Sequence, residues 1–395
     1  MGNKTFERKH KEDKPVIALC YDFDKTLSPD DMQAQGYIQS VGFDVKTFWK
    51  ESNSLAANND MDQNLAYMFK MIEESEGHFI VNREKLAEYG AKVVLFPGVT
   101  DWFERIRKYG EERGVIIEHY IISSGLKEMI EGTKMAKAGA FEKIYASSFY
   151  FNERGVAKWP AQVINFTNKT QFLFRIEKGV LDINDAGVND YFTPEEIRVP
   201  FRNMIYIGDS DTDIPCMKLV NTHGGHSIGV YNPNTMEKNK VYKMIRDNRI
   251  RYFAPADYSE GTELDTLVKA IIDRTVANEV LENIHLQAES EVRATNTEQQ
   301  NLITEDKKNA LILALESSFS FAMTHTTIKK LSKYVDWTPE QIDRLFIAAI
   351  SNFQVQWILT DEDVAEFYTN LLSATPSLSE AAQKVKAELS AKDNE

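Results

Sequence analysis

Cysteine is scarce in this sequence, and long apolar runs are missing from it. Only Cys20 and Cys216 occur among 395 residues, so a disulfide-stapled scaffold is excluded; reduced thiols are the simplest interpretation, with a single disulfide left open. No apolar run approaches the ~18 residues that a membrane-spanning helix needs. The first ten residues, MGNKTFERKH, are charged and lack the apolar stretch of a secretory signal. We therefore expect a soluble, cytoplasmic protein with no membrane partner.

An excess of basic residues is also missing. The formal net charge is -14 at pH 7, from 46 Lys and Arg against 60 Asp and Glu. Nucleic acids and anionic membranes attract basic surfaces, so this balance argues against either as the main partner. A local basic cleft remains compatible with it. The length is sufficient for two or three domains with cores of their own.

Three short apolar runs that end in polar residues stand out along the chain: Val16–Tyr21, Tyr120–Ile122 and Met204–Ile207. Such continuous runs are typical of strands buried on both faces of a parallel sheet. Stretches between them, such as Val99 to Arg113, have apolar residues at helical spacing. The alternation predicts an α/β fold with a parallel sheet. In such sheets ligands bind beyond the carboxyl ends of the strands, where each run has its polar residues.

Two segments interrupt the alternation. Residues 28–95 have helical spacing and few strand signals, which predicts a small helical insertion over the functional end of the sheet. Residues 144–160 contain two strand-like pieces around Asn152–Gly155, which predicts a hairpin. The α/β core is therefore expected to comprise residues 14–27 and 96–278.

The last part of the chain is predicted to be helical. Apolar residues from Thr262 to His285 repeat at helical spacing, and the polar stretch after them is a linker or the exposed continuation of that helix, assigned to residues 279–305. Helical periods continue over residues 306–395, with helix starts at Thr338–Gln341 and Thr360–Asp363 and only a short helix start at the end. We expect this region to pack on the core or to form a contact in a homo-oligomer.

The clearest chemistry lies in Asp22-Phe-Asp-Lys-Thr-Leu27, directly after the first apolar run. Residues two apart in extended chain point to the same side, so Asp22 and Asp24 leave the strand together. The two carboxylates repel each other unless a cation or a shared proton relieves them, and Mg²⁺ suits such a pair. One carboxylate can then attack phosphorus while the other, kept protonated, donates to the leaving oxygen. The plainer alternative is a surface turn with two solvated acids.

A second acidic segment, Gly208-Asp-Ser-Asp-Thr-Asp213, follows the third apolar run. Asp209 and Asp213 are four apart, so a helical turn starting there directs both carboxylates toward the same cleft. They would complete a cation site, with Asp209 as a direct ligand and Asp213 in support. Taken alone, the segment is equally compatible with a calcium-like loop or a helix N-cap, although the EF-hand pattern fails.

Two weaker features concern phosphate binding. Ser123-Ser124-Gly125 follows the second apolar run, so a hydroxyl and nearby backbone N–H groups can hold a phosphate at a helix N-terminus, although such a serine is usually only an N-cap. Lys169 can neutralise a phosphate during its transfer, and Lys178 competes for the same role. A lone lysine is nearly always a solvated surface charge.

Taken together, these motifs resemble the haloacid dehalogenase superfamily, most closely its phosphoserine-phosphatase-like branch. That family shows DxDx[TV], a strand-end Ser or Thr, a Lys, and GDxxxD in chain order. In this sequence the order is kept by Asp22–Thr26, Ser123, Lys169 and Gly208–Asp213. The resemblance covers residues 14–278 and implies a Rossmann-like parallel sheet core with residues 28–95 as its helical cap. The C-terminal helical region is additional to it.

The resemblance also implies residue roles. Asp22 is the nucleophile and Asp24 the general acid/base, and this acid favours phosphoryl transfer because family dehalogenases lack it. Mg²⁺ is held by the Asp22 side chain, the Asp24 backbone carbonyl and Asp209, with Asp213 behind. The phosphate is bound by Thr26, Ser123, Ser124, Gly125 and Lys169. Thr212 departs from the Asn that is typical of phosphoserine phosphatases, so the substrate stays open.

The sequence thus predicts a magnesium-dependent phosphatase that hydrolyses a small phosphate monoester through an aspartyl-phosphate on Asp22. Caps of this kind usually enclose small phosphorylated metabolites, which disfavours a protein or nucleic-acid substrate. One alternative is a phosphotransferase or mutase that uses the same intermediate. Another is a phosphate-ligand sensor whose C-terminal helical region binds a partner.

Overall fold

The computed structural model describes residues 6–295, 297–375 and 378–392. The chain forms two compact units, Met1–Glu282 and Asn283–Glu395, and each is described by itself. Within the described ranges, no helix has the length and apolar character that crossing a membrane requires.

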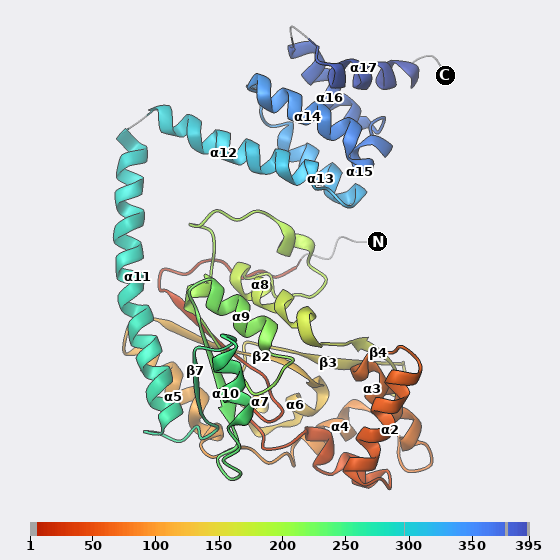
Figure 1. Cartoon of the computed structure of the whole chain (residues 1–395), viewed down its shortest axis with the longest axis vertical. Coiled ribbons are helices and arrows are strands. Elements are labelled where there is room, and N and C mark those ends of the chain that lie inside the picture. Colours follow the sequence, from red (N-terminus) through yellow and green to blue (C-terminus); the bar gives the residue numbers. More distant parts are fainter. Residues whose placement is uncertain (1–5, 296, 376–377, 393–395) are drawn as a thin grey trace. The chain divides into compact units, whose positions relative to one another are not determined.

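A seven-stranded sheet is the centre of the first unit (Figure 1). Its strands are β1 Val16–Tyr21, β2 Ile116–Leu126, β3 Lys143–Phe151, β4 Ala157–Gln162, β5 Met204–Gly208, β6 His226–Tyr231 and β7 Tyr252–Pro255. Their order across the sheet is β4-β3-β2-β1-β5-β6-β7, and all neighbours are parallel except the antiparallel pair β3 and β4. The predicted α/β class, parallel sheet and hairpin are confirmed.

Helices cover both faces of this sheet, because the side chains of each buried strand alternate between two apolar cores. In β1, Ile17, Leu19 and Tyr21 belong to one core and Val16, Ala18 and Cys20 to the other. The first core is closed by α5 Val99–Glu111, α6 Lys127–Gly132, α7 Lys134–Lys137 and α11 Glu263–Thr295. The second is closed by α8 Thr170–Lys178, α9 Ile214–Thr222 and α10 Asn239–Arg246.

The strand order reverses beside β1. From this central strand the chain steps outward to β2 and β3 on one side, and later from β5 to β6 and β7 on the other. In open α/β sheets, ligands bind where the strand order reverses, outside the carboxyl ends. Asp22 directly follows β1 and Asp209 directly follows β5, so both stand at this point.

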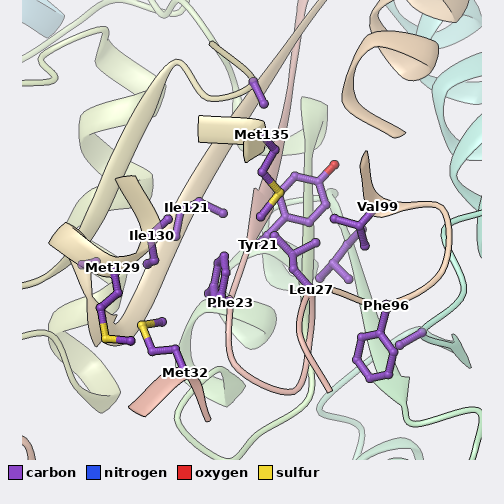
Figure 2. Packing of buried hydrophobic residues seen from close by; sticks show 14 of the residues in the cluster. Tyr21, Phe23, Leu27, Met32, Phe96, Val99, Ile121, Met129, Ile130 and Met135 are labelled. Carbon is purple, nitrogen blue, oxygen red and sulfur yellow. The ribbon is translucent and has the colours of Figure 1, made fainter. Parts of the chain in front are cut away.

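The insertion after β1 is helical, as predicted. It contains α1 Tyr37–Ser40, α2 Val45–Asn58, α3 Gln63–Ser75 and α4 Arg83–Gly90. Its attachment to the core is close, because a Cβ on Gly90 would lie 1.8 Å from the Met129 carbonyl oxygen of α6. Figure 2 shows side chains of the shared core, with Phe23 from the loop after β1, Met32 from the insertion and Met129 from α6.

Strand β2 is longer than predicted, starting at Ile116 instead of Tyr120. The added part contains Glu118 and His119, two polar residues that are buried. The His119 ring is hydrogen-bonded at Nδ1 to the Tyr21 hydroxyl, 3.0 Å away, and at Nε2 to the Phe103 carbonyl, 3.1 Å away. Because these partners are distant in sequence, nothing near Glu118 and His119 indicates that these two polar residues are buried. The predicted strand therefore began too late.

Glu118→Gln is expected to lower the free energy of unfolding by about 3 kcal/mol at pH 7. Two guanidinium N–H groups of Arg198 donate to the Glu118 carboxylate at 2.8 and 2.7 Å, and Lys9 donates at 2.6 Å. Burial raises the pKa of Glu118, but these hydrogen bonds outweigh it and lower the pKa from 4.5 to about 2. The glutamine leaves the buried Arg198 without its strongest partner.

Urea unfolding of both proteins across pH measures this effect. Because the folded-state pKa is lowered, the stabilisation is present above pH 4.5 and is lost as the pH falls toward 2, so the two curves should converge in acid. Glu142→Gln, which removes a more exposed partner of Lys9, is the control and should cost less than about 1 kcal/mol. Equal losses in the two variants would contradict the prediction.

The second unit is a helical bundle with an apolar core of its own. Its helices are α12 Thr297–Glu316, α13 Phe321–Leu331, α14 Pro339–Ser351, α15 Phe353–Trp357, α16 Glu362–Ala374 and α17 Glu380–Lys392. The predicted helical region is confirmed, and so is the capping box at the start of α14. There the Gln341 N–H donates to Thr338 Oγ1 at 3.2 Å, and the Thr338 N–H donates to Gln341 Oε1 at 3.1 Å.

Three local predictions for the C-terminal part need correction or completion. The polar stretch after His285 continues α11 to Thr295, so it is helix there and not linker. Helix α16 has Asp361 at its N-cap instead of Thr360. The end of the chain is more than a short helix start, since α17 has 13 residues and buries Ala382 and Val385 in the bundle core. Residues 393–395, the last of the predicted helical region, lie outside the described residues.

Candidate active site

Three carboxylates meet at the carboxyl ends of β1 and β5. The Asp22 N–H donates to the Ile207 carbonyl of β5 at 3.0 Å, which fixes the chain just after β1 against its neighbour. Asp209 and Asp213 come from the segment after β5. One oxygen from each of Asp22, Asp209 and Asp213 lies within 4.8 Å of the other two. The structure therefore unites carboxylates from two motifs nearly 190 positions apart into one cluster.

Lys169 is the cation of this cluster and is fully buried. Its Nζ donates to Asp213 Oδ1 at 2.8 Å and lies 3.3 Å from Asp22 Oδ1. Burial lowers the pKa of Lys169, but the charges of Asp213 and Asp22 outweigh it and raise the pKa above its ordinary value. The ammonium therefore stays charged beside the Asp22 carboxylate.

Asp213 is held by hydrogen bonds on both oxygens. Its Oδ1 accepts from the Tyr206 hydroxyl at 2.9 Å in addition to Lys169, and its Oδ2 accepts from the Ser210 N–H at 3.0 Å and hydroxyl at 2.9 Å. A Cβ on Gly208 would come within 2.6 Å of Asp213 Oδ2, so a larger residue at this position would displace the Asp213 carboxylate. These contacts make Asp213 a positioning group for Lys169 and for the loop after β5.

Asp22 and Asp209 carry negative charge that the protein relieves only in part. Burial and the charge of Asp213 raise the pKa of Asp22 from 3.8 to about 6, and Lys169 opposes them. Burial also raises the pKa of Asp209 to about 7, where Lys240 lowers it and the other two carboxylates raise it further. Asp22 Oδ1 is buried and accepts no hydrogen bond among the described residues. An oxygen-only donor set with excess negative charge fits a divalent cation.

Asp24 lies outside the three-carboxylate cluster. Its Oδ1 accepts from the Met32 N–H at 2.8 Å, a contact between the loop after β1 and the helical insertion. Burial, and then the charges of Asp31 and Asp22, raise the pKa of Asp24 well above 3.8. The carboxyl therefore favours its protonated form, which can donate a proton.

Two of the predicted phosphate-binding residues, Ser123 and Lys169, interact with Asp22. Ser123 is buried, and its hydroxyl is among the groups that lower the pKa of Asp22 by hydrogen bonding. The hydroxyls of Thr26 and Ser124 are buried and have no hydrogen-bond partner among the described residues. A Cβ on Gly125 would lie 2.9 Å from Asp24 Oδ2, so the backbone approaches the site closely there.

One detail of this loop differs from the expectation: the helix begins at Lys127 and not directly after Ser123. Strand β2 continues to Leu126, with a register irregularity between Ser123 and Leu126, and α6 begins at Lys127. The Ser123 hydroxyl instead accepts from the Gly125 N–H at 3.1 Å. The register irregularity at this end of β2 thus lies between Ser123 and the start of α6.

Of the two candidate lysines, the structure brings only Lys169 to the carboxylates. Lys178 donates to the Val188 and Asp190 carbonyls, each at 2.8 Å, and thereby secures a loop after α8. The difference arises because the turn at Phe166–Lys169 directs one lysine inward just before α8 begins.

Sequence reasoning missed four residues at this site: Tyr67, Tyr206, Ser210 and Lys240. Tyr206 and Ser210 flank the recognised Asp209 closely, so a search for hydrogen-bonding neighbours would have found them. Tyr67 donates from its hydroxyl to the Ser124 carbonyl at 2.9 Å, and Lys240 lies 3.4 Å from Asp209 Oδ2. Neither of these two has a signal in the sequence, because only the fold creates its contact.

Comparison with known proteins supports the motif assignment. The family model of haloacid dehalogenase-like hydrolases matches residues 19–218. An uncharacterized protein of Borreliella burgdorferi is 30% identical over 279 residues, which cover 64% of this chain and 95% of the relative.

Among solved structures, a haloacid dehalogenase family hydrolase from Salmonella enterica serovar Typhi aligns with a TM-score of 0.43 at 15% identity, over 66% of this chain and 73% of that one. A probable phosphoserine phosphatase from Vibrio cholerae aligns with a TM-score of 0.44 at 10% identity, over 67% of each chain. The family model spans all four motifs in their order, from Asp22 to Asp213. The chain belongs to the haloacid dehalogenase-like hydrolase family and is an enzyme of the hydrolase class.

Proposed function

We propose that this hydrolase is a magnesium-dependent phosphatase that cleaves a small phosphate monoester through an aspartyl-phosphate on Asp22. One observation carries the proposal. A buried Asp22 oxygen without a hydrogen-bond donor lies 3.3 Å from the charged Lys169 and within reach of two further carboxylates. This arrangement suits a nucleophile whose target is an anionic phosphoryl group.

The chemistry takes two steps on the chain's own residues. An Asp22 carboxylate oxygen forms a bond to phosphorus while the bond from phosphorus to the ester oxygen breaks, and Asp24 donates a proton to that leaving oxygen. Asp24 then accepts a proton from a water molecule as the water oxygen attacks the aspartyl-phosphate. Inorganic phosphate leaves, and Asp22 is ionised again for the next turnover.

A divalent cation fits the cluster described above. The side chains of Asp22 and Asp209 and the backbone carbonyl of Asp24 would hold it, with Asp213 behind. Mg²⁺ is the proposed ion because it prefers a few carboxylates together with phosphate and water oxygens. When bound, it neutralises phosphate charge and so stabilises the transition state of transfer.

The phosphate itself would be bound by Lys169, by Ser123 and by the hydroxyls of Thr26 and Ser124. The buried, unpartnered state of the last two hydroxyls supports this role, since a buried polar group without a hydrogen bond is costly unless a ligand supplies one. The helical insertion contacts the same loop through Tyr67 and Ser124. We propose that it acts as a cap and limits access to small phosphorylated metabolites.

Phosphate release from a panel of small monoesters tests this function. With Mg²⁺ present, at least one ester is expected to be hydrolysed, and EDTA should abolish release because the carboxylates then repel the substrate phosphate. Re-addition of Mg²⁺ should restore the rate. Release that EDTA does not affect would contradict the cation-dependent mechanism. Cleavage of the ester that requires an added acceptor, with the phosphoryl group found on the acceptor and not as inorganic phosphate, would favour the phosphotransferase alternative.

A further inference from the structure

Lys240 touches the proposed cation site although no motif contains it. It lies in the first turn of α10, which follows β6, whereas Asp209 follows the neighbouring strand β5. Lys240 Nζ is 3.4 Å from Asp209 Oδ2, and no other acidic partner of this ammonium is found in the described part of the chain. A positive charge of the protein thus lies beside one oxygen of the carboxylate that binds the metal in the proposed function.

The two lysines of the site differ in how firmly they are held. Lys169 is fully buried between Asp22 and Asp213, so removing it from the cluster would require burying a charge without a partner. The Lys240 side chain is 43% exposed, while the Asp209 carboxylate is 12% exposed. Lys240 can therefore exchange Asp209 for water by rotating its flexible stem.

A divalent cation and the Lys240 ammonium would bind the same carboxylate, that of Asp209. A Mg²⁺ ligand oxygen lies about 2.1 Å from the ion, so an ion on Asp209 would come within a few ångströms of Lys240 and repel it. We infer that Lys240 competes with the divalent cation for Asp209 and thereby sets how tightly the site holds its metal. This inference rests on the proposed function, in which Asp209 is a direct ligand.

This competition changes the charge balance of the three-carboxylate cluster. Asp22, Asp209 and Asp213 face one buried cation, Lys169, so negative charge is in excess. Lys240 offsets part of that excess from the solvent side and weakens the attraction for any divalent ion. The result is a site that binds its cation exchangeably, whereas three uncompensated carboxylates would hold it more tightly.

Calorimetric titration of the full chain with Mg²⁺ tests the inference without using turnover. Lys240→Gln should tighten the Mg²⁺ dissociation constant by about three- to tenfold, since it removes a half-exposed like charge. Lys240→Arg, which keeps the charge, should stay close to the wild-type value. Lys243→Gln removes an exposed lysine one turn along α10 and is the matched control, with no change expected. High salt should shrink the Lys240→Gln effect by screening.

An unchanged or weaker affinity in Lys240→Gln would overturn the inference. Should that variant fold poorly, Lys240→Met gives the same charge change, and the rise in Tm on adding Mg²⁺ gives a second readout. Asp209→Asn distinguishes an error in the proposed cation site from an error in the role of Lys240. If Asp209→Asn keeps wild-type affinity, the cation site of the proposed function is wrong; if it loses affinity while Lys240→Gln and Lys240→Met change nothing, only the role of Lys240 fails.

Discussion

Asp22→Asn is expected to reduce phosphate release by at least about 10⁴-fold and to leave the fold intact. The amide has the shape of the carboxylate but lacks a negatively charged oxygen that can bond to phosphorus. No neighbour replaces it, because Asp213 already accepts hydrogen bonds on both oxygens and Asp209 pairs with Lys240. The loss should appear in kcat, since binding of the phosphate by Lys169 and Ser123 remains.

The fold should survive because the native carboxylate is electrostatically unfavourable where it lies. The pKa of Asp22 is raised from 3.8 to about 6, so its proton is held more tightly in the folded state. Stability from this group is therefore full below pH 3.8 and declines as the pH rises toward 6. In EDTA at pH 8, Asp22→Asn avoids that cost, and its Tm should be equal to or above that of the wild type.

Acid-quenched wild-type enzyme should carry a covalent phosphate after mixing with a good substrate, and Asp22→Asn should carry none. Asp211→Asn is the matched control, because Asp211 is an exposed acid in the segment after β5 and takes no part in the cluster. Its turnover should stay within a few fold of wild type. Retained turnover in a folded Asp22→Asn protein would remove Asp22 as the nucleophile.

Prediction from the sequence was most accurate where the structure of a short segment depends on the residues of that segment alone. The run Val16–Tyr21 is apolar on both faces and was predicted with its observed bounds, and the capping box at Thr338 is local by nature. Order along the chain was enough to group Asp22 with Asp209, because parallel strands present their carboxyl ends at one edge. These inferences need the strand positions alone and no side-chain geometry.

The sequence was least informative where a residue depends on a distant partner. Glu118 and His119 interrupt an apolar pattern, yet both lie within β2 because Arg198 and Tyr21 satisfy them. Lys240 lies 31 positions after Asp209, and their contact exists only because β5 and β6 are neighbours. Polar pairs of this kind leave no periodic signal in the sequence. The contacts of buried polar residues and of partly exposed lysines such as Lys240 therefore could not be predicted from the sequence.

Asp24→Asn is expected to slow turnover by about 10²- to 10⁴-fold, with the size of the loss set by the leaving group. An ester with a basic alkoxide leaving group needs the proton from Asp24, so it should show the large loss. An ester of an acidic phenol leaves without that proton, and its first step should be nearly unaffected. Comparing the two substrates in single-turnover experiments separates proton donation from a loss of folding, which would slow both equally.

The pH profile provides the second arm of this test. The pKa of Asp24 is raised by burial and by the charges of Asp31 and Asp22, so the proton is retained above the ordinary range of a carboxyl and the rate should fall only as the pH rises through that raised value. Asp24→Asn should abolish this alkaline limb. Asp31→Asn removes a charge that raises the pKa of Asp24 and also releases Lys25, which lies 2.7 Å from Asp31 and lowers the same pKa. Both changes favour the ionised form of Asp24, so the alkaline limb should persist in Asp31→Asn and move to lower pH. If the limb does not move in Asp31→Asn, or is still present in Asp24→Asn, the titrating acid is another residue.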